Sequence, residues 1–356
     1  MNDLKKTFSG KKILLTGHTG FKGTWMLSVL NMLGAEVIGY ALAPEDNCLY
    51  QSINGDRLCQ SIIGDIRNKE YLDQVIQDCQ PDYVFHLAAQ ALVLPSYEDP
   101  LYSFEVNTLG TAYLMESLRK LNKECKAVVI TTDKVYRNLE ANKAYSENDK
   151  LGGHDPYSGS KAAAELVVDS YIRSFFENQL SHVRVCVARA GNVIGGGDWS
   201  DHRIIPDIVT AIHQGNPIVL RNPASTRPWQ HVLDPIFGYL FLAGEMKDTS
   251  LPNAFNFGPD PQESVSVLEL TKRAVQIWGS GKIEMDNQSN TLHESKQLLL
   301  NSSLAMNMLN WHPVLSQMES IDWTIEWYKQ VLMDNTPALD AVDKQVEAYF
   351  MHFQNK

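Results

Sequence analysis

The sequence predicts an α/β protein in which a doubly wound parallel sheet is followed by a smaller, mixed C-terminal domain. Two observations support this fold class. Through the first half of the chain, short apolar runs alternate with segments of helical periodicity, which is typical of parallel strands joined by right-handed crossover helices. In addition, a glycine-rich loop follows the first apolar run directly and leads into the first helix-like segment.

The order of apolar runs and helical segments gives the expected elements. Strands are expected at residues 12–16, 36–42, 60–64, 82–88, 127–131 and 182–188. Helices are expected between them, at 23–33, 69–78, 102–121 and 158–176. Beyond residue 188 we expect loops rich in Gly, Pro and Asn, a helix near 206–214, a helix near 234–246, a strand near 254–257, and amphipathic helices at 264–279 and 320–333.

This order of elements predicts two domains. We assign residues 1–190 to a cofactor-binding domain, to which 231–258 are expected to return. Residues 191–230 and 259–356 are assigned to the second, smaller domain. A chain of 356 residues is long for a single core, which agrees with this division.

The composition excludes several classes of protein. The net charge of −11 argues against a nucleic-acid partner or an anionic membrane surface. The five cysteines are scattered and none forms a CxxC pair, so we expect reduced thiols and no metal site. No apolar run reaches membrane-spanning length and no signal peptide is evident, so a cytoplasmic location is expected.

The glycine-rich loop at residues 16–23, TGHTGFKG, carries the cofactor prediction. Its glycines allow a sharp turn, a close approach of backbone to a pyrophosphate, and close packing of helix on sheet, as in a Rossmann domain. Glycines also end strands for steric reasons, but here a strand precedes the loop and a helix follows it. The expected contacts to the cofactor are Gly17, His18, Gly20, Phe21, Lys22 and Gly23.

The end of the second expected strand bears on the choice between NAD and NADP. No carboxylate follows that strand until Glu45 and Asp46, so the usual acidic partner of the NAD ribose is missing. No basic residue lies between Lys22 and Arg57, so nothing there would hold the 2′-phosphate of NADP. The sequence therefore favours NAD, held less firmly than usual.

Later strand ends supply further expected cofactor contacts. Asp65 and Ile66 are placed to meet the adenine, although Asp65 could equally be a helix cap before Asn68. The remaining expected contacts are Leu87, Ala88, Ala89, Gln90, Asn107 and Thr131, together with Tyr157 and Lys161.

Tyr157 and Lys161 form the expected catalytic pair. Four residues apart on a helix, the two side chains lie on one face. An ammonium beside a phenol stabilises the phenolate and lowers its pKa, so the tyrosine can take the proton of a hydroxyl whose carbon gives hydride to NAD. The same spacing occurs on ordinary helices, and the preceding dinucleotide loop is what gives it this meaning here.

Three more candidate catalytic residues, Thr132, Asp133 and Lys134, end the fifth expected strand. This is the edge at which parallel sheets bind ligands. A simple dehydrogenase needs only a hydroxyl donor there, whereas Asp133 and Lys134 add an acid and a base. The alternative is a solvated pair of charges at a strand end.

At this point the sequence resembles the nucleotide-sugar branch of the extended short-chain dehydrogenases, and within it the CDP-glucose 4,6-dehydratases. The matching stretches are TGHTGFKG, HLAAQ, TTDKVY, ENDKLGGHDPYSGSK, RAGNVIGGGDWSDHRIIPD, RPWQHVLD and HESKQLLLNSSLAMNMLNWHP. Lys134 discriminates, because related dTDP-glucose dehydratases carry glutamate at this position. Leu94 and Gln297 depart from the family, which usually has arginine and tyrosine there.

The resemblance implies a mechanism for these residues. Tyr157 would remove the 4-hydroxyl proton, Thr132 would donate to O4, and Asp133 would protonate the departing 6-hydroxyl. Lys134 would take the C5 proton, directly or through a water, since an ordinary lysine is almost fully protonated at neutral pH. The product would be a 4-keto-6-deoxy sugar, with the cofactor regenerated.

The resemblance also places the substrate in the loop-rich region, where basic residues suit a diphosphate. The expected substrate contacts are Ser96, Asn192, Arg203, Pro206, Arg221, Arg227 and Glu294. Each arginine could instead be a surface ion-pair partner, and we expect Trp229 to be a core residue rather than a base-stacking one.

Two rival functions remain at this point. A sugar epimerase or reductase of the same fold would transfer hydride at C4 alone and would not need Asp133 and Lys134. A non-catalytic dinucleotide sensor would not need the Tyr157–Lys161 pair. By analogy with the family we also expect a homodimer, and the choice of cytidine comes from the resemblance alone.

Overall fold

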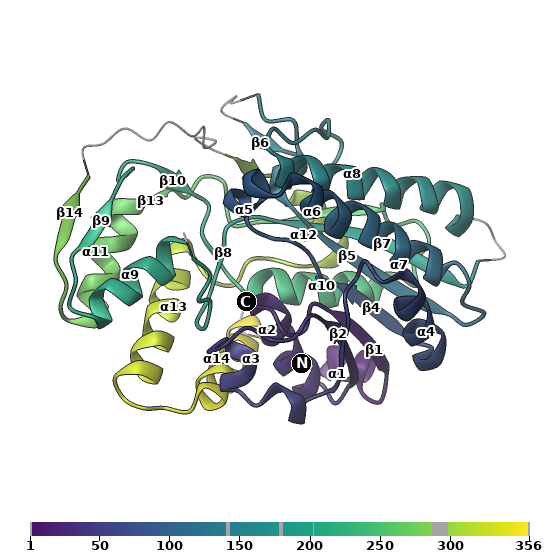
Figure 1. The fold of residues 1–356 in the computed structure, drawn as a ribbon, viewed down its shortest axis with the longest axis horizontal. Coiled ribbons are helices and arrows are strands. Elements are labelled where there is room, and N and C mark those ends of the chain that lie inside the picture. Colours follow the sequence, from purple (N-terminus) through teal and green to yellow (C-terminus); the bar gives the residue numbers. More distant parts are fainter. Residues whose placement is uncertain (1, 140–142, 178–180, 202, 287–297, 355–356) are drawn as a thin grey trace.

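The computed structural model describes residues 2–139, 143–177, 181–201, 203–286 and 298–354. At its centre is a seven-stranded parallel sheet with the order β12-β7-β5-β4-β1-β2-β3 (Figure 1). Its strands are β1 Lys12–Thr16, β2 Glu36–Ala41, β3 Gln60–Ile63, β4 Tyr83–His86, β5 Cys125–Thr132, β7 Val183–Ala190 and β12 Ala254–Phe257. The strand order reverses between β1 and β4, where doubly wound sheets bind ligands beyond the strands' carboxyl ends. The predicted fold class and the seven predicted strands are confirmed.

Helices cover both faces of this sheet (Figure 1). One apolar core contains residues of α1 Asn2–Phe8, α2 Phe21–Met32, α10 Leu233–Glu245 and α14 Ala338–Gln354. The core on the other face contains residues of α4 Lys69–Cys79, α7 Gly110–Leu118 and α8 Pro156–Tyr171. The two buried cores explain why most of these strands are apolar throughout rather than alternating.

A π-helical turn interrupts the single helix that periodicity predicts at 102–121. The structure has α6 Pro100–Phe104, the π turn η2 Glu105–Leu109, and then α7. Asn107 lies in that turn, where its amide donates to the Gln90 carbonyl and the Ser160 hydroxyl, and its oxygen accepts from the Gln90 N–H. The extra residue in the turn thus lets Asn107 bridge the end of β4 and α8.

The other helical segments are short or lie late in the chain. The helix predicted at 158–176 is α8 followed by a π turn, η4 Ile172–Phe176. Short elements are α3 Leu49–Ser52, η1 Gly55–Arg57, α5 Val93–Glu98 and η3 Asp133–Val135. The terminal helices α1 and α14 were not predicted, and α14 packs against α2 and α13.

Outside the central sheet, small paired strands combine with amphipathic helices. The pairs are β6 Ala144–Tyr145 with β15 Leu299–Leu300, β8 Val193–Ile194 with β11 Gln230–His231, β9 Ile218–Leu220 with β14 Ile283–Met285, and β10 Thr226–Arg227 with β13 Val265–Ser266. The helices are α9 Ile204–His213, α11 Val267–Trp278, α12 Ser303–Leu309 and α13 Gln317–Leu332. In Figure 1, α9, α11 and α13 gather at the end of the molecule away from α4 and α7. The division into two domains stays a prediction.

Within the described residues, no helix has the length and apolar character that a membrane crossing requires. The same part of the chain contains no cluster of three or more His, Cys, Asp or Glu side chains suited to a metal ion. All five cysteine thiols are free, and Cys125 and Cys186 are buried.

One buried carboxylate attaches the C-terminal helix to the rest of the molecule. Asp234 Oδ1, at the start of α10, accepts hydrogen bonds from the Tyr349 hydroxyl and the Val314 N–H, both at 2.7 Å. All three residues are buried. The side chain of Asp234 therefore links α10, the segment before α13, and α14.

We expect Tyr349→Phe to lower the free energy of unfolding by about 1.5–3 kcal/mol, because a buried hydrogen bond to a charged group is lost. Urea titration followed by circular dichroism measures the change. Tyr97→Phe, at a half-exposed tyrosine, is the control. Equal stability of the two variants would contradict the anchoring role of Asp234.

Candidate active site

The glycine loop has the close approaches that the sequence predicts. Gly17 has a φ of +74°, and a Cβ there would lie 2.7 Å from the backbone nitrogen of Ala88. A Cβ on Gly23 would overlap the Gly17 carbonyl oxygen. A larger residue at either position would therefore push the loop away from β4 or from the start of α2.

The start of α2 fits the diphosphate of NAD. Gly20 caps the helix without a side-chain hydrogen bond, and the first turn has no acidic residue, so its N–H groups and positive dipole end are available to an anion. Lys22 adds a cation, with its Nζ 3.4 Å from the Tyr239 hydroxyl. Burial, followed by the charges of Arg203 and Lys161, lowers the pKa of Lys22 to about 7. The residues present thus fit the group.

His18 lies in the expected loop, but its side chain is fully buried against the sheet. Its Nε2 is 2.9 Å from the Ser61 hydroxyl, and its ring contacts Tyr50 edge-on. The ring packs directly over Gly39, where the Cβ of any other residue would overlap it. Burial lowers the pKa of His18 to about 4. A cofactor contact from this residue stays a prediction.

The structure bears on the two predicted roles of Asp65, adenine contact and helix cap. The cap of α4 is Asn68, whose side chain accepts from the Tyr71 N–H. Asp65 instead forms an ion pair with Arg67, whose Nη2 is 2.7 Å from Asp65 Oδ2. This hydrogen-bonded pair lowers the pKa of Asp65. The helix-cap alternative is wrong, and the predicted adenine contacts of Asp65 and the buried Ile66 stay predictions.

The predicted catalytic tyrosine lies at the first turn of α8. Asp155 caps this helix by accepting from the Ser158 N–H, and Pro156 occupies its first position. Ser96, which the sequence assigns to the substrate, is buried and accepts a hydrogen bond from the Tyr157 N–H at 3.1 Å. Its hydroxyl donates to Val93 O. Ser96 therefore holds the backbone of Tyr157 in place.

Tyr157 and Lys161 are both almost completely buried. Lys161 Nζ donates to the Ile130 carbonyl at 3.2 Å, and burial lowers its pKa to about 8. The expected lowering of the Tyr157 pKa is wrong for this structure. Burial raises the pKa of Tyr157, and the charge of Lys134 and the hydroxyl of Thr132 only partly oppose this effect.

Thr132, Asp133 and Lys134 come together where β5 ends. The Thr132 hydroxyl donates to Asp133 Oδ1 at 2.8 Å, and Lys134 Nζ is 3.8 Å from the same oxygen. The Asp133 side chain is 1% exposed, whereas that of Lys134 is 35% exposed. Asp133 fits because Gly191, at the end of β7, has no Cβ to overlap its carboxylate. The alternative of a solvated charge pair is therefore wrong for Asp133.

A buried ion pair that was not predicted lies directly behind these residues. Arg189 on β7 forms hydrogen bonds through Nε and Nη2 to Glu165 on α8, at 3.0 and 2.5 Å. Thr131, an expected cofactor contact, donates its hydroxyl to Glu165 at 2.5 Å. Glu165 follows Lys161 by one helical turn, which was the available signal in the sequence. The pair fixes α8 against β5 and β7.

The predicted substrate residues lie on several elements. Arg203 caps α9 and pairs with the buried Asp198 at 2.8 Å. Its charge contributes to the lowered pKa of Lys22 and partly opposes the raised pKa of Tyr157, so it lies near the catalytic residues. Asp198 belongs to the quoted GGGDWS stretch but was not singled out. Arg203 is thus both near the site and held by an acidic partner.

The other substrate residues are less closely connected to that centre. Arg221 is exposed after β9, Arg227 is partly buried on β10, Pro206 is buried in α9, and Asn192 follows β7 with a φ of +36°. Glu294 and Gln297 lie outside the described residues. Trp229 is buried and donates to the Val265 carbonyl, so it is a core residue as predicted.

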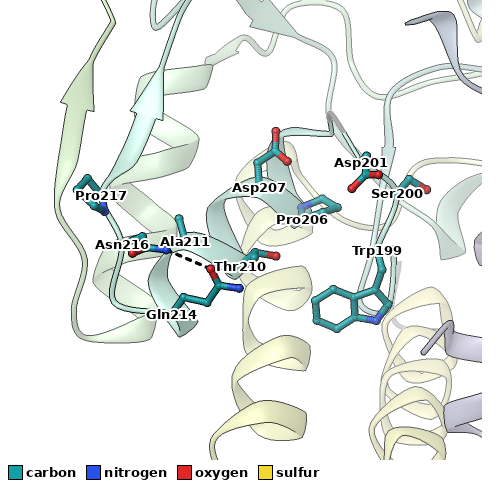
Figure 2. Close-up of a pocket in the computed structure, with 10 residues that line it drawn as sticks. All are labelled: Trp199, Ser200, Asp201, Pro206, Asp207, Thr210, Ala211, Gln214, Asn216 and Pro217. Carbon is teal, nitrogen blue, oxygen red and sulfur yellow. Dashed lines mark hydrogen bonds between the residues drawn. The ribbon is translucent and has the colours of Figure 1, made fainter. Parts of the chain in front are cut away.

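A surface depression of about 330 Å³ lies beside α9 (Figure 2). Figure 2 shows Asp201 and Asp207 at its rim, with Trp199 on one side and Asn216 on the other. None of its lining residues is basic. Its two carboxylates would repel a diphosphate, so this depression is unsuited to the phosphates of a nucleotide sugar.

A protein-family model described as the NAD dependent epimerase/dehydratase family matches residues 13–258. The chain belongs to this family. A CDP-glucose 4,6-dehydratase from Salmonella typhimurium is 40% identical over 331 residues, which are 91% of this chain and 92% of that relative. The aligned region of this epimerase/dehydratase family member therefore covers most of the length of that relative.

Solved structures share the fold. A UDP-glucuronic acid 4-epimerase from Bacillus cereus, in complex with UDP-glucuronic acid and NAD, superposes with a TM-score of 0.76 and 24% identity over 90% of this chain and 99% of that one. A dTDP-glucose 4,6-dehydratase from Bacillus anthracis, in complex with NAD, gives 0.74 and 23%, over 90% and 97%. With sequence identities of 24% and 23%, these superpositions confirm the fold of this chain.

The burial of Lys161 gives a prediction about stability and pH. Its pKa is about 8 in the folded chain, but about 10.4 in an unfolded one. Between these values the unfolded state binds more protons, so this group makes stability rise with pH. Below about pH 8 both states are protonated and the full cost of burying the charge remains.

We therefore expect Lys161→Met to abolish turnover but to raise the thermal midpoint by a few degrees near pH 7, with a smaller gain near pH 9.5. Scanning calorimetry at both pH values measures this difference. Lys6→Met, at an exposed lysine, is the control. A midpoint for Lys161→Met below that of the parent at neutral pH would show that Lys161 stabilises the fold.

Proposed function

We propose that this epimerase/dehydratase family member is a CDP-glucose 4,6-dehydratase, which converts CDP-D-glucose to CDP-4-keto-6-deoxy-D-glucose. One observation carries the proposal: the buried Asp133, with Lys134 beside it, adds an acid and a base to the Tyr157–Lys161 pair. The 40% identity to a relative of that name supports the choice of CDP-glucose.

The first half of the reaction uses α8 and the end of β5. When bound, NAD accepts hydride from C4 of the sugar and later returns it to C6. Tyr157 takes the proton of the 4-hydroxyl, and Thr132 donates a hydrogen bond to O4. Lys161, fixed by the Ile130 carbonyl, would offset part of the cost that burial imposes on the phenolate.

The second half uses the residues that an oxidation does not need. The C4 ketone acidifies the C5 hydrogen, and Lys134 removes it as a proton, directly or through a water. Asp133 gives its proton to the 6-hydroxyl, which leaves as water when the C6–O bond breaks. C6 then receives the hydride and C5 a proton, so the sugar has lost one water with no net oxidation.

The site proposal also covers the groups that hold the ligands. Lys22, the α2 N-terminus and the strand-end residues would bind NAD. Arg203, Arg221 and Arg227 would bind the substrate diphosphate, as guanidinium groups do. The second candidate is a nucleotide-sugar 4-epimerase, since relatives of the same fold include such enzymes. An epimerase has no use for Asp133 as an acid toward O6.

Product analysis tests the function directly. The protein is incubated with NAD and, separately, CDP-, dTDP-, UDP- and GDP-glucose, and the products are identified by mass and by carbon NMR. A 4-keto-6-deoxy sugar formed fastest from CDP-glucose is the expected result. Conversion to a galactose epimer with no loss of water would overturn the proposal in favour of the epimerase.

We expect Tyr157→Phe to lower turnover by more than about a hundredfold, because only the proton transfer is removed. Binding of NAD and CDP-glucose, measured by calorimetry, should change little. Turnover within a factor of about ten of the parent would exclude Tyr157 as the base.

We expect the double change Asp133→Asn with Lys134→Met to separate oxidation from elimination. The variant should still oxidise C4, so absorbance of the reduced cofactor should build up on the enzyme. It should not exchange the C5 hydrogen with deuterated solvent. A uniform slowing of every step without this build-up would mean that both residues merely support the strand end.

We also propose a homodimer that forms through the helices of one face. Exposed apolar side chains gather on neighbouring segments α6, η2, α8 and η4. They are Leu101, Phe104, Leu109, Leu166 and Phe175. Such a patch on a globular protein is typical of an interface, and two copies joined by a twofold axis would cover it.

The dimer has its own test. Light scattering at micromolar concentration should give twice the chain mass, and Leu101→Glu combined with Leu166→Glu should give the monomer. Met351→Glu, at an exposed apolar residue on α14, should leave the mass unchanged. A monomeric parent protein would refute the homodimer.

The remaining parts of the proposal concern context. We propose a cytoplasmic location and a place in deoxysugar biosynthesis for lipopolysaccharide O-antigen. The biosynthetic role rests on the proposed activity, since the ketone product is a precursor for deoxysugar synthesis, and the location rests on the sequence expectation. Neither is needed for the chemistry described above.

A further inference from the structure

The two oxygens of the Asp133 carboxylate have different surroundings. Oδ1 accepts from the Thr132 hydroxyl and lies 3.8 Å from Lys134 Nζ. Oδ2 is buried beside Gly191 and has no hydrogen-bond partner among the described residues. A buried carboxylate oxygen without a donor is costly, so Oδ2 requires one.

Gln230, on β11, has a second buried acceptor of the same kind. Its side-chain amide donates to the Gly191 carbonyl at 2.7 Å and to the Phe257 carbonyl at 3.1 Å. Both amide hydrogens are therefore used. Its Oε1 is buried and, within the part of the chain that the structure describes, accepts no hydrogen bond.

A small cavity joins these two acceptors. Asp133 and Gln230 both line it, and its volume is about 10 Å³, which is the lower limit for one water molecule. Its other walls include Pro228 and Pro259, which have no N–H. The N–H of Gly258, also in the wall, already donates to the Ser302 hydroxyl. Pro228, Pro259 and Gly258 thus offer no free N–H to the two acceptors.

We propose that one water binds in this cavity, donates one hydrogen to Asp133 Oδ2 and the other to Gln230 Oε1, and thereby makes Gln230 a positioning residue for the acid. The water site stands on the cavity and its acceptors, whereas the catalytic consequence rests on the proposed dehydratase function. A water has two hydrogens to give, which matches the two acceptors.

This arrangement decides which oxygen of Asp133 holds the proton. With both its hydrogens donated, the water keeps Oδ2 as an acceptor, so the acidic proton resides on Oδ1. The Thr132 hydroxyl, which donates to Oδ1 of the carboxylate, then accepts from the protonated Oδ1. That oxygen faces Thr132 and Lys134. When the proton leaves with the 6-hydroxyl as water, the hydrogen bond to Oδ2 becomes charge-assisted and stabilises the carboxylate. The buried water keeps both its hydrogens throughout.

A crystal structure of the unmodified protein, at a resolution that shows ordered waters, tests the site without any assay. The expected result is one water within hydrogen-bond distance of Asp133 Oδ2 and Gln230 Oε1. A dry cavity would overturn the proposal. So would a direct contact between the two oxygens, because the proton would then lie on Oδ2.

Step-resolved kinetics test the positioning role. Gln230→Met should leave C4 oxidation and C5 exchange within about threefold of the parent and slow water loss at least about tenfold, since an acid contributes a hundredfold or more. Reduced cofactor should therefore accumulate. Gln317→Met is the matched control: Gln317 is equally buried and its amide also donates to a backbone carbonyl, that of Glu263.

The double variant Gln230→Met with Asp133→Asn completes the test. If Gln230 acts through Asp133, adding Gln230→Met to Asp133→Asn should slow elimination less than about twofold further. Full additivity, or equal slowing of oxidation and elimination in Gln230→Met alone, would overturn the positioning role. A parent protein that releases no 4-keto-6-deoxy sugar would refute the proposed function, while the crystallographic water would still decide the site.

Discussion

The buried ion pair between Arg189 and Glu165 determines how the parts of the site meet. Arg189 lies on β7 and Glu165 on α8, and Thr131 on β5 donates to the same carboxylate. The guanidinium also donates to Tyr136, which in turn donates to Asn256 on β12. Three strands and α8 are thus joined by hydrogen bonds inside the protein, and those made by Arg189 and Glu165 are charge-assisted. Removing one partner of such a pair costs about 3–5 kcal/mol.

A buried ion pair of this kind is weak evidence for net stability, but it fixes the relative positions of the strand and the helix that it joins. Because α8 cannot slide on the strand ends, Tyr157 and Lys161 keep their relation to the residues that follow β5. Ser96 and the Asp155 cap then hold the first turn of the helix. None of these hydrogen bonds involves the reacting groups of Tyr157 and Lys161 themselves. Together they hold α8, which carries both side chains, in a fixed position against β5 and β7.

Charge is distributed unevenly between the whole chain and this centre. The chain carries a net charge of −11, yet Lys22, Lys134, Lys161 and Arg203 lie close to Tyr157 or Asp133. Asp133 is one of several buried carboxylates there, with Glu165 beside Lys161 and Asp198 beside Arg203. Burial lowers the pKa of Lys22 and Lys161, so both are poised to lose their protons. Bound phosphates would oppose that loss. Cationic side chains at this centre favour anionic ligands there, although the chain as a whole is acidic.

Local sequence signals predicted the sheet well because buried parallel strands are short, apolar and separated by amphipathic helices. The break in the helix at 102–121 was not predictable, since the π turn allows Asn107 to contact Gln90, in the segment after β4, and Ser160 on α8. The same limit applies to the site. Tyr157 and Lys161 share a face through local helical geometry, whereas the Arg189 partnership depends on which distant segments pack together.

The burial of Asp133 is what separates a dehydratase from an epimerase in physical terms. An isolated buried carboxylate is expensive, and here the nearest cation, Lys134, is 3.8 Å away and partly in solvent. Asp133 also requires glycine at position 191 to fit. Hydride transfer at C4 gains nothing from this arrangement. A dehydration does gain, because a proton donor close to the 6-hydroxyl lets that hydroxyl leave as water.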